Sequence, residues 1–202
     1  MSLDLLLAFI VFALVGSITP GPNNMMLLAS GVNFGFGRTV PHLLGVSIGF
    51  AAMVVAMGFG LGAVFKAYPV LHLVLRYAGA GYLLFLAWKI ATAGAPSEGG
   101  ATNGRPITFL QAAAFQWVNP KAWVLAISAI ATYTPSEGFF LNVILVAIIF
   151  GAVNLPCVGL WVLFGTAMRR LLTRPSTVRV FNIAMAAALV ASLYPIFSDA
   201  WA

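Results

Sequence analysis

The sequence predicts an all-α membrane protein in which six transmembrane helices form two inverted three-helix repeats, with helices 1 and 4 broken. Composition is the first observation, because 62% of the 202 residues are hydrophobic and 7% are charged, against roughly 45–50% and about 25% in soluble domains. The second is a set of six apolar stretches, each long enough for the roughly 20 helical residues that cross a bilayer. The third is a polar linker that separates three stretches from the other three.

Six transmembrane spans are expected along the chain. They cover residues 3–31, 41–65, 69–88, 108–133, 139–168 and 178–197. The linker, residues 93–107, is rich in Gly, Pro, Ser and Asn and has no helical periodicity. It divides a first repeat, residues 1–92, from a second, residues 108–202. Because three spans carry the chain to the opposite side, the two repeats must lie in the membrane with inverted orientations.

The basic residues indicate the topology, because Lys and Arg accumulate on the cytoplasmic side of membrane proteins. One side collects Arg38, Lys89, Arg105, Arg169, Arg170, Arg174 and Arg179, and the other collects Lys66 and Arg76. We therefore expect both termini on the non-cytoplasmic side. The net charge of +6 comes from basic residues that lie between apolar spans, and it therefore does not indicate a nucleic-acid partner. The lipid bilayer is the expected partner, and a homodimer is left open.

The first span contains a segment that cannot continue a helix. It comprises Thr19, Pro20, Gly21, Pro22, Asn23 and Asn24. Two prolines remove backbone donors, so the span is expected to break here. In hydrocarbon the freed backbone groups need partners, and the break must line a polar cavity or pack against protein. Pro22 suits the first position of a new helix, whose amides would attract a carboxylate.

The fourth span carries a corresponding interruption. Its polar residues are Gln116, Asn119 and Lys121, and Pro120 breaks the helix. Lys121 is the only charged residue deep inside a span, and intramembrane charges are usually functional. Pro20 and Pro120 occupy corresponding places in the two repeats, and paired broken helices mark the binding sites of transporters. We therefore interpret both segments as a candidate substrate-binding site.

The fifth span adds Asn154 and Pro156, which form another break-like element. An amide side chain in hydrocarbon needs a partner on a neighbouring helix. Asn154 therefore joins the candidate site residues, while a purely structural role stays equally open.

Residues 45–49 match the serine-hydrolase pattern G-x-S-x-G, and His42 lies nearby. That pattern needs a strand-to-helix turn, whereas these residues lie inside an apolar run. Gly45 and Gly49 also have the small-xxx-small spacing that lets helices approach closely, and we favour this interpretation. His42 is expected at the membrane interface. The sequence predicts no enzymatic activity, no cofactor and no metal site.

Together these motifs resemble the LysE/RhtB family of amino-acid exporters. The resemblance rests on residues 19–24, 35–37, 45–50, 79–89 and 109–121. It implies a six-helix transporter of the bacterial inner membrane that exports amino acids or close derivatives, with the proton gradient as the expected driving force. Residues 87–92 and 105–109 are most similar to the branch that exports cysteine and O-acetylserine.

The residue types indicate how a zwitterionic amino acid would bind between the repeats. Its carboxylate would face Lys121 and the amides of the helix that begins at Pro22. Its ammonium would face the broken-helix carbonyls and Asn23, Asn24 or Asn119. Protons are the expected coupling ion, although no Asp or Glu lies well inside a span to carry them. Lys121 is a candidate carrier, because burial disfavours its charged form.

A metal-ion exporter or channel is the alternative function. A divalent metal pathway would use several intramembrane carboxylates, histidines or cysteines. The sequence offers His42 and Cys157 without an obvious cluster, so the amino-acid exporter is favoured.

Overall fold

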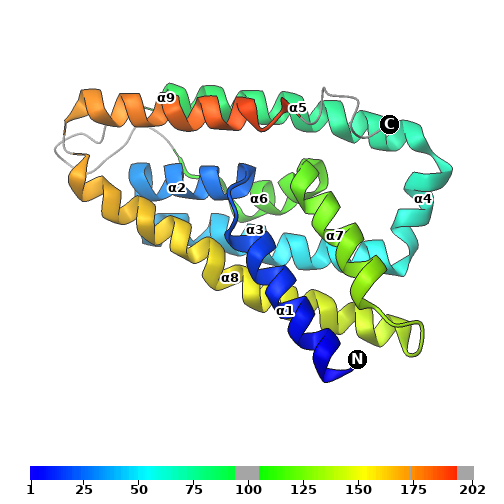
Figure 1. Ribbon diagram of the computed structural model, residues 1–202. Helices are drawn as coiled ribbons and strands as arrows, with labels where there is room; N and C mark the ends of the chain where they lie inside the picture. The colour runs from blue at the N-terminus through cyan, green and yellow to red at the C-terminus, as the bar shows by residue number, and fades with distance from the viewer. Residues whose placement is uncertain (94–104, 173, 195–202) are drawn as a thin grey trace.

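The computed structural model describes residues 1–93, 105–172 and 174–194, so most of the predicted linker and the end of the last predicted span lie outside the described residues. Within these ranges the chain is helical and contains no strand. The elements are α1 (Leu3–Ile18), α2 (Pro22–Phe34), α3 (Phe36–Ala56), η1 (Met57–Leu61), α4 (Gly62–Ala67), α5 (Pro69–Ala91), α6 (Phe109–Phe115), η2 (Gln116–Val118), α7 (Pro120–Tyr133), α8 (Phe139–Leu171) and α9 (Pro175–Ala191). Figure 1 shows α5 and α9 side by side along one edge, and α8 crossing the molecule beside α1, α2 and α3.

Three helical stretches in the described ranges are long and apolar enough to cross a membrane. They are Phe36–Val64, Leu73–Ala91 and Phe139–Arg169. The bent pair α1 and α2 forms a fourth if it counts as one span. The fourth predicted span is divided among α6, η2 and α7, and α9 has 17 residues. The protein is therefore helical with three to four candidate membrane spans, and the six-helix inverted arrangement stays a prediction.

The outer face of α1 shows why the molecule needs lipid. Leu3, Leu7, Val11 and Leu14 follow one another at helical spacing, and their side chains are between 48% and 69% exposed. A continuous apolar stripe of this kind would be unstable in water, whereas hydrocarbon covers it without cost. The helix thus exposes one apolar face, while Phe9, Ala13 and Ser17 on the other face are buried in the protein.

An aromatic cluster joins the helices around the site. Phe9 of α1 and Phe150 of α8 are fully buried, and the rings of Phe50 and Phe150 have centroids 4.6 Å apart. Tyr133, at the end of α7, lies 5.1 Å from Phe9. Such tilted ring pairs contribute about 0.5–1.5 kcal/mol beyond their burial. This cluster fixes α1, α3, α7 and α8 against one another on one side of the breaks.

Glycines bring α3 and α6 into backbone contact. A Cβ atom on Gly45 would lie 2.3 Å from the Phe109 carbonyl oxygen, and one on Gly49 would lie 2.5 Å from the Ala113 Cα. Any larger residue would push the helices apart. The small-xxx-small interpretation is therefore confirmed, and Ser47 lies within a continuous helix rather than on a nucleophile elbow.

Two backbone features differ from the sequence prediction. The prediction of a break-like element at Pro156 is wrong, because α8 continues through this residue from Phe139 to Leu171. A proline in a membrane helix removes one backbone donor, and neighbouring groups compensate. An unpredicted bend lies at Gly60, whose φ of 109° is readily adopted only by glycine. There η1 passes into α4, which leads to α5 (Figure 1).

Candidate functional site

Both predicted breaks of the first and fourth spans are present. α1 ends at Ile18 and α2 begins at Pro22, with the two helices bent by 54°. The second break is at Asn119, between η2 and α7, and Pro120 takes the first position of α7. In both helices the proline stands where its missing N–H removes no helical hydrogen bond. Each break therefore leaves backbone groups that side chains or ligands can bind.

The carbonyls freed at the end of α1 are bound by side chains. Asn24 Nδ2 donates to the carbonyl oxygens of Ser17 and Thr19 at 2.9 and 2.8 Å. Trp161 Nε1, from α8, donates to the carbonyl oxygen of Ile18 at 3.2 Å. Because Asn24 belongs to α2, its two bonds join the helices on either side of the break. The first break is thus held in a defined conformation.

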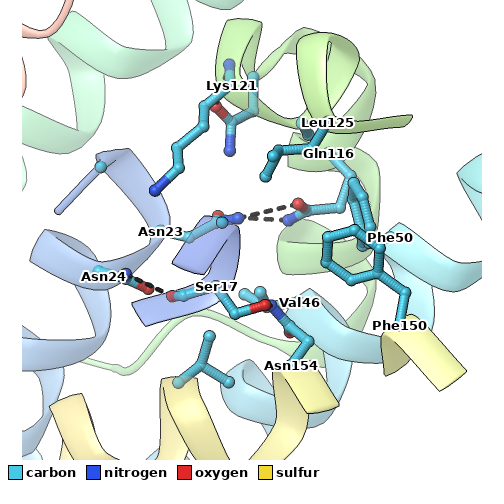
Figure 2. A pocket seen from close by; sticks show the side chains of 15 residues that line it. Ser17, Asn23, Asn24, Val46, Phe50, Gln116, Lys121, Leu125, Phe150 and Asn154 are labelled. Carbon is cyan, nitrogen blue, oxygen red and sulfur yellow. Dashed lines mark hydrogen bonds between the residues drawn. The ribbon is translucent and has the colours of Figure 1, made fainter. Parts of the chain in front are cut away.

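Lys121 reaches across from the second break to the first. Its ammonium donates to the Thr19 carbonyl oxygen at 2.7 Å, to Thr19 Oγ1 at 2.8 Å and to the Pro20 carbonyl oxygen at 3.3 Å. These bonds use the three donors of the ammonium group. A Cβ atom on Gly21 would lie 2.8 Å from the Lys121 Cδ, so the glycine leaves room for this side chain. Figure 2 shows the lysine extended toward the break.

A reciprocal amide pair forms a second bridge between the breaks. Asn23 Nδ2 donates to Gln116 Oε1 at 2.9 Å, and Gln116 Nε2 donates back to Asn23 Oδ1 at 3.2 Å (Figure 2). Gln116 is fully buried and also donates to the Ala112 carbonyl oxygen at 2.9 Å. Buried amides paired in this way avoid the cost of unpaired polar groups. The pair therefore closes the space between α2 and η2.

Asn154 of α8 connects three helices near the two breaks. Its Nδ2 donates to Ser17 Oγ of α1 at 3.1 Å, and its Oδ1 accepts from Ser47 Oγ of α3 at 2.9 Å. All three side chains are buried. The hydroxyl groups of the two serines are thus the hydrogen-bond partners that this amide was expected to have on neighbouring helices.

A small cavity lies between the two breaks. Its volume is about 30 Å³, which is room for one or two water molecules, since each needs roughly 10–15 Å³ on this measure. Apolar walls come from Val46, Phe50, Leu125 and Phe150. An amino acid is several times larger than water. The structure therefore shows the site in a closed conformation.

Seven of the eleven candidate residues line this cavity. They are Gly21, Asn23, Asn24, Gln116, Asn119, Lys121 and Asn154. Thr19 and Pro20 do not line it, but their carbonyl oxygens bind Lys121. Pro22 and Pro120 begin the two helices behind it. The structure thus brings the residues of both breaks and Asn154 to one place.

The sequence did not predict three residues of the site, nor the burial of His42. Ser17, Ser47 and Trp161 hold the site together, and the signal that could have found them is a polar atom inside an apolar span. His42 is fully buried in α3, which the sequence did not predict. Neither ring nitrogen has a hydrogen-bond partner, which distinguishes His42 from every other buried polar side chain that the structure describes.

A polar centre built from two broken helices, surrounded by apolar helices, is typical of membrane transport proteins. Comparison with known protein families identifies the family to which the chain belongs. The family model of the LysE type translocators matches residues 14–192. The chain belongs to this family, as its motifs predicted, and is a multi-pass bacterial membrane protein.

Individual relatives match over nearly the whole chain. The cysteine/O-acetylserine efflux protein of Escherichia coli (strain K12) is 32% identical over 98% of this chain and 100% of its own length, and that of Shigella sonnei (strain Ss046) gives the same values. The protein of the same name from Escherichia coli O1:K1 / APEC is 33% identical over the same shares. No solved structure matches the chain significantly.

Proposed function

We propose that the protein exports small amino acids of the cysteine and O-acetylserine type, or close derivatives, from the bacterial cytoplasm in exchange for protons. Its membership of the LysE type translocators supports an exporter, and the names of its relatives support the substrate class. The same comparisons do not favour a metal-ion exporter or channel.

The observation that carries the proposed binding mode is the Lys121 ammonium, bound by three oxygen atoms of the first break. The α-ammonium of an amino acid has the same three donors and the same charge. It would replace the lysine at the oxygens of Thr19 and Pro20, while the substrate carboxylate pairs with the displaced lysine. The N-terminal amides of α2 lie beside this point and favour an anion.

Substrate binding requires the site to open, because the cavity of about 30 Å³ holds only water. Two bridges, from Lys121 to Thr19 and from Asn23 to Gln116, connect the proposed first and second repeats. Alternating access would break them and form them again as one repeat moves against the other. In this conformation the groups that are proposed to hold the substrate also hold the site closed.

The proposed topology has six spans, two inverted repeats and both termini outside the cytoplasm. It rests on the distribution of Lys and Arg over the loops. A cysteine introduced at Ser2 of the C157S variant would react with an impermeant thiol reagent on intact cells. Reaction only after the cells are opened would reverse the orientation.

The decisive experiment is transport by the purified protein in proteoliposomes. Labelled cysteine, O-acetylserine, threonine, homoserine, leucine and lysine are each tested with and without a pH difference. We expect saturable movement of cysteine and O-acetylserine that the pH difference accelerates. Transport at the same rate with and without the pH difference would contradict proton coupling. If the folded protein transports none of these amino acids, the proposed exporter function is wrong.

A further inference from the structure

A second and larger cavity lies between α2, the end of α5 and the segment at Arg105. Its volume is about 300 Å³, against about 30 Å³ between the breaks. Pockets that bind small molecules start at roughly this volume. A small amino acid therefore fits here in the conformation that excludes it from the closed site.

The charge of this cavity favours an anion. Lys89 and Arg105 both line it, and no acidic residue lines it in the described part of the chain. Lys89 lies over the ring of Phe85 at 5.7 Å, and neither cation forms an ion pair with a described residue. A lysine and an arginine that have no carboxylate partner among the described residues form a binding place for the carboxylate of a solute.

The remaining lining suits a small, mainly apolar body. Met26, Leu86 and Ile107 form apolar walls, and Ser30 and Asn33 add polar groups along α2. Asn33 is held rigid by a reciprocal amide pair with Asn182 of α9, at 3.0 and 3.2 Å. The side of the cavity formed by α2 is therefore fixed before a ligand arrives.

The two cavities lie along the same helix. Asn23 of α2 lines the closed site, whereas Met26, less than one turn further on, lines the larger cavity. One helical turn rises about 5.4 Å. Met26 is 2% exposed and belongs to an apolar cluster with Leu83 and Phe115. This cluster separates a molecule in the larger cavity from the Asn23–Gln116 pair.

We propose that the larger cavity is a first binding site, where the carboxylate of a small neutral amino acid binds to Lys89 and Arg105 before the molecule passes Met26 to the site between the breaks. This proposal rests on the exporter function proposed above. Both cations belong to the group that the sequence predicts on the cytoplasmic side, from which an exporter takes its substrate.

The test is the concentration dependence of transport by the K89Q/R105Q variant in proteoliposomes, with substrate supplied on the side that carries these residues. We expect KM to rise about tenfold, as for the loss of about 1.4 kcal/mol of binding, with kcat within about twofold of wild type. Added salt should raise the wild-type KM and change that of the variant much less. The matched control is R174Q/R179Q, which removes two basic residues of the same predicted side that do not line the cavity.

An unchanged KM in K89Q/R105Q, or an equal rise in R174Q/R179Q, would overturn the first binding site. A fall in kcat at unchanged KM would overturn it as well. If the double variant does not fold, the single variants K89Q and R105Q are measured, and each should raise KM by a smaller factor. Failure of the wild-type protein to move any amino acid would instead overturn the exporter function itself, so the two failures are distinguishable.

Discussion

The two breaks are closed in different ways. At the first, the backbone oxygens of residues 17–20 are bound by side chains of Asn24, Trp161 and Lys121, two of which come from distant helices. The second is closed locally, because Asn119 caps α7 through its own side chain at 3.2 Å from the Lys121 backbone nitrogen. The backbone of the first break presents acceptors, whereas Lys121 of the second break supplies donors to them.

This difference assigns separate tasks to the two breaks. In the first break the Lys121 ammonium binds the carbonyl oxygens of Thr19 and Pro20, which is the place that the proposed mechanism gives to the substrate ammonium. The second break is stable by itself and can move its lysine without losing its helix cap. Removing the side-chain groups that bridge the two breaks should therefore slow transport. Altering the helix contacts around them should instead lower the stability of the protein.

The largest expected effect follows removal of the Lys121 ammonium. K121M should slow exchange by more than about 100-fold, because the substrate carboxylate loses its proposed partner, and two charge-assisted hydrogen bonds to it would contribute about 3 kcal/mol together. Initial rates of labelled amino-acid exchange in proteoliposomes measure this, with K66M on α4 as the matched lysine control. Wild-type exchange by K121M would remove the lysine from the mechanism.

The contact between α3 and the helix before the second break can be tested next. G45A should lower the free energy of unfolding by about 2 kcal/mol, because its methyl group would overlap the Phe109 carbonyl oxygen. In G81A the added methyl group meets nothing within 4 Å, so this variant is the control. Thermal unfolding in detergent compares them, and equal melting temperatures would contradict the close packing.

The amide pair between the breaks should have an intermediate effect. N23A and Q116A should each slow exchange by about tenfold, because each removes one partner of the amide pair and leaves polar atoms of the other without it, at a cost of about 1–3 kcal/mol. The double variant should be no slower than the worse single variant, since all three lose the same pair. Effects that multiply to about 100-fold would show that the two side chains act independently.

The smallest expected effect concerns His42, whose two ring nitrogens have no hydrogen-bond partner. H42L should raise the free energy of unfolding by about 1 kcal/mol, because an apolar side chain of similar size avoids burying two unpaired ring nitrogens. The melting temperature in detergent measures the change. A clear loss of stability would mean that the ring is bound by a group such as a buried water molecule.

The sequence predicted the breaks because proline chemistry acts locally. Pro20, Pro22 and Pro120 restrict their own backbone whatever surrounds them, and the structure has non-helical residues at both places. Gly45 and Gly49 likewise predicted a close helix contact from their spacing alone. Pro156 shows the limit of this reasoning, because the packing around α8 preserves a helix that the residue type disfavours.

The partners of the site residues could not be predicted. Helices that are apolar on all sides give no periodic signal for which face turns inward. The bonds of Lys121 to Thr19 and of Asn154 to Ser17 depend on the rotation and height of neighbouring helices. For the same reason the burial of His42 and the bend at Gly60 were not expected.

The most direct test of the account is competition between the identified amino-acid substrate and its decarboxylated amine. The substrate carboxylate is proposed to pair with Lys121 while the ammonium takes its place at the first break, so the amine alone cannot hold the displaced lysine. We predict that the amine inhibits wild-type exchange at least about 100-fold more weakly than the amino acid, as for the loss of about 3 kcal/mol. Equal inhibition by the amine would contradict the exchange of ammonium groups on which the mechanism depends.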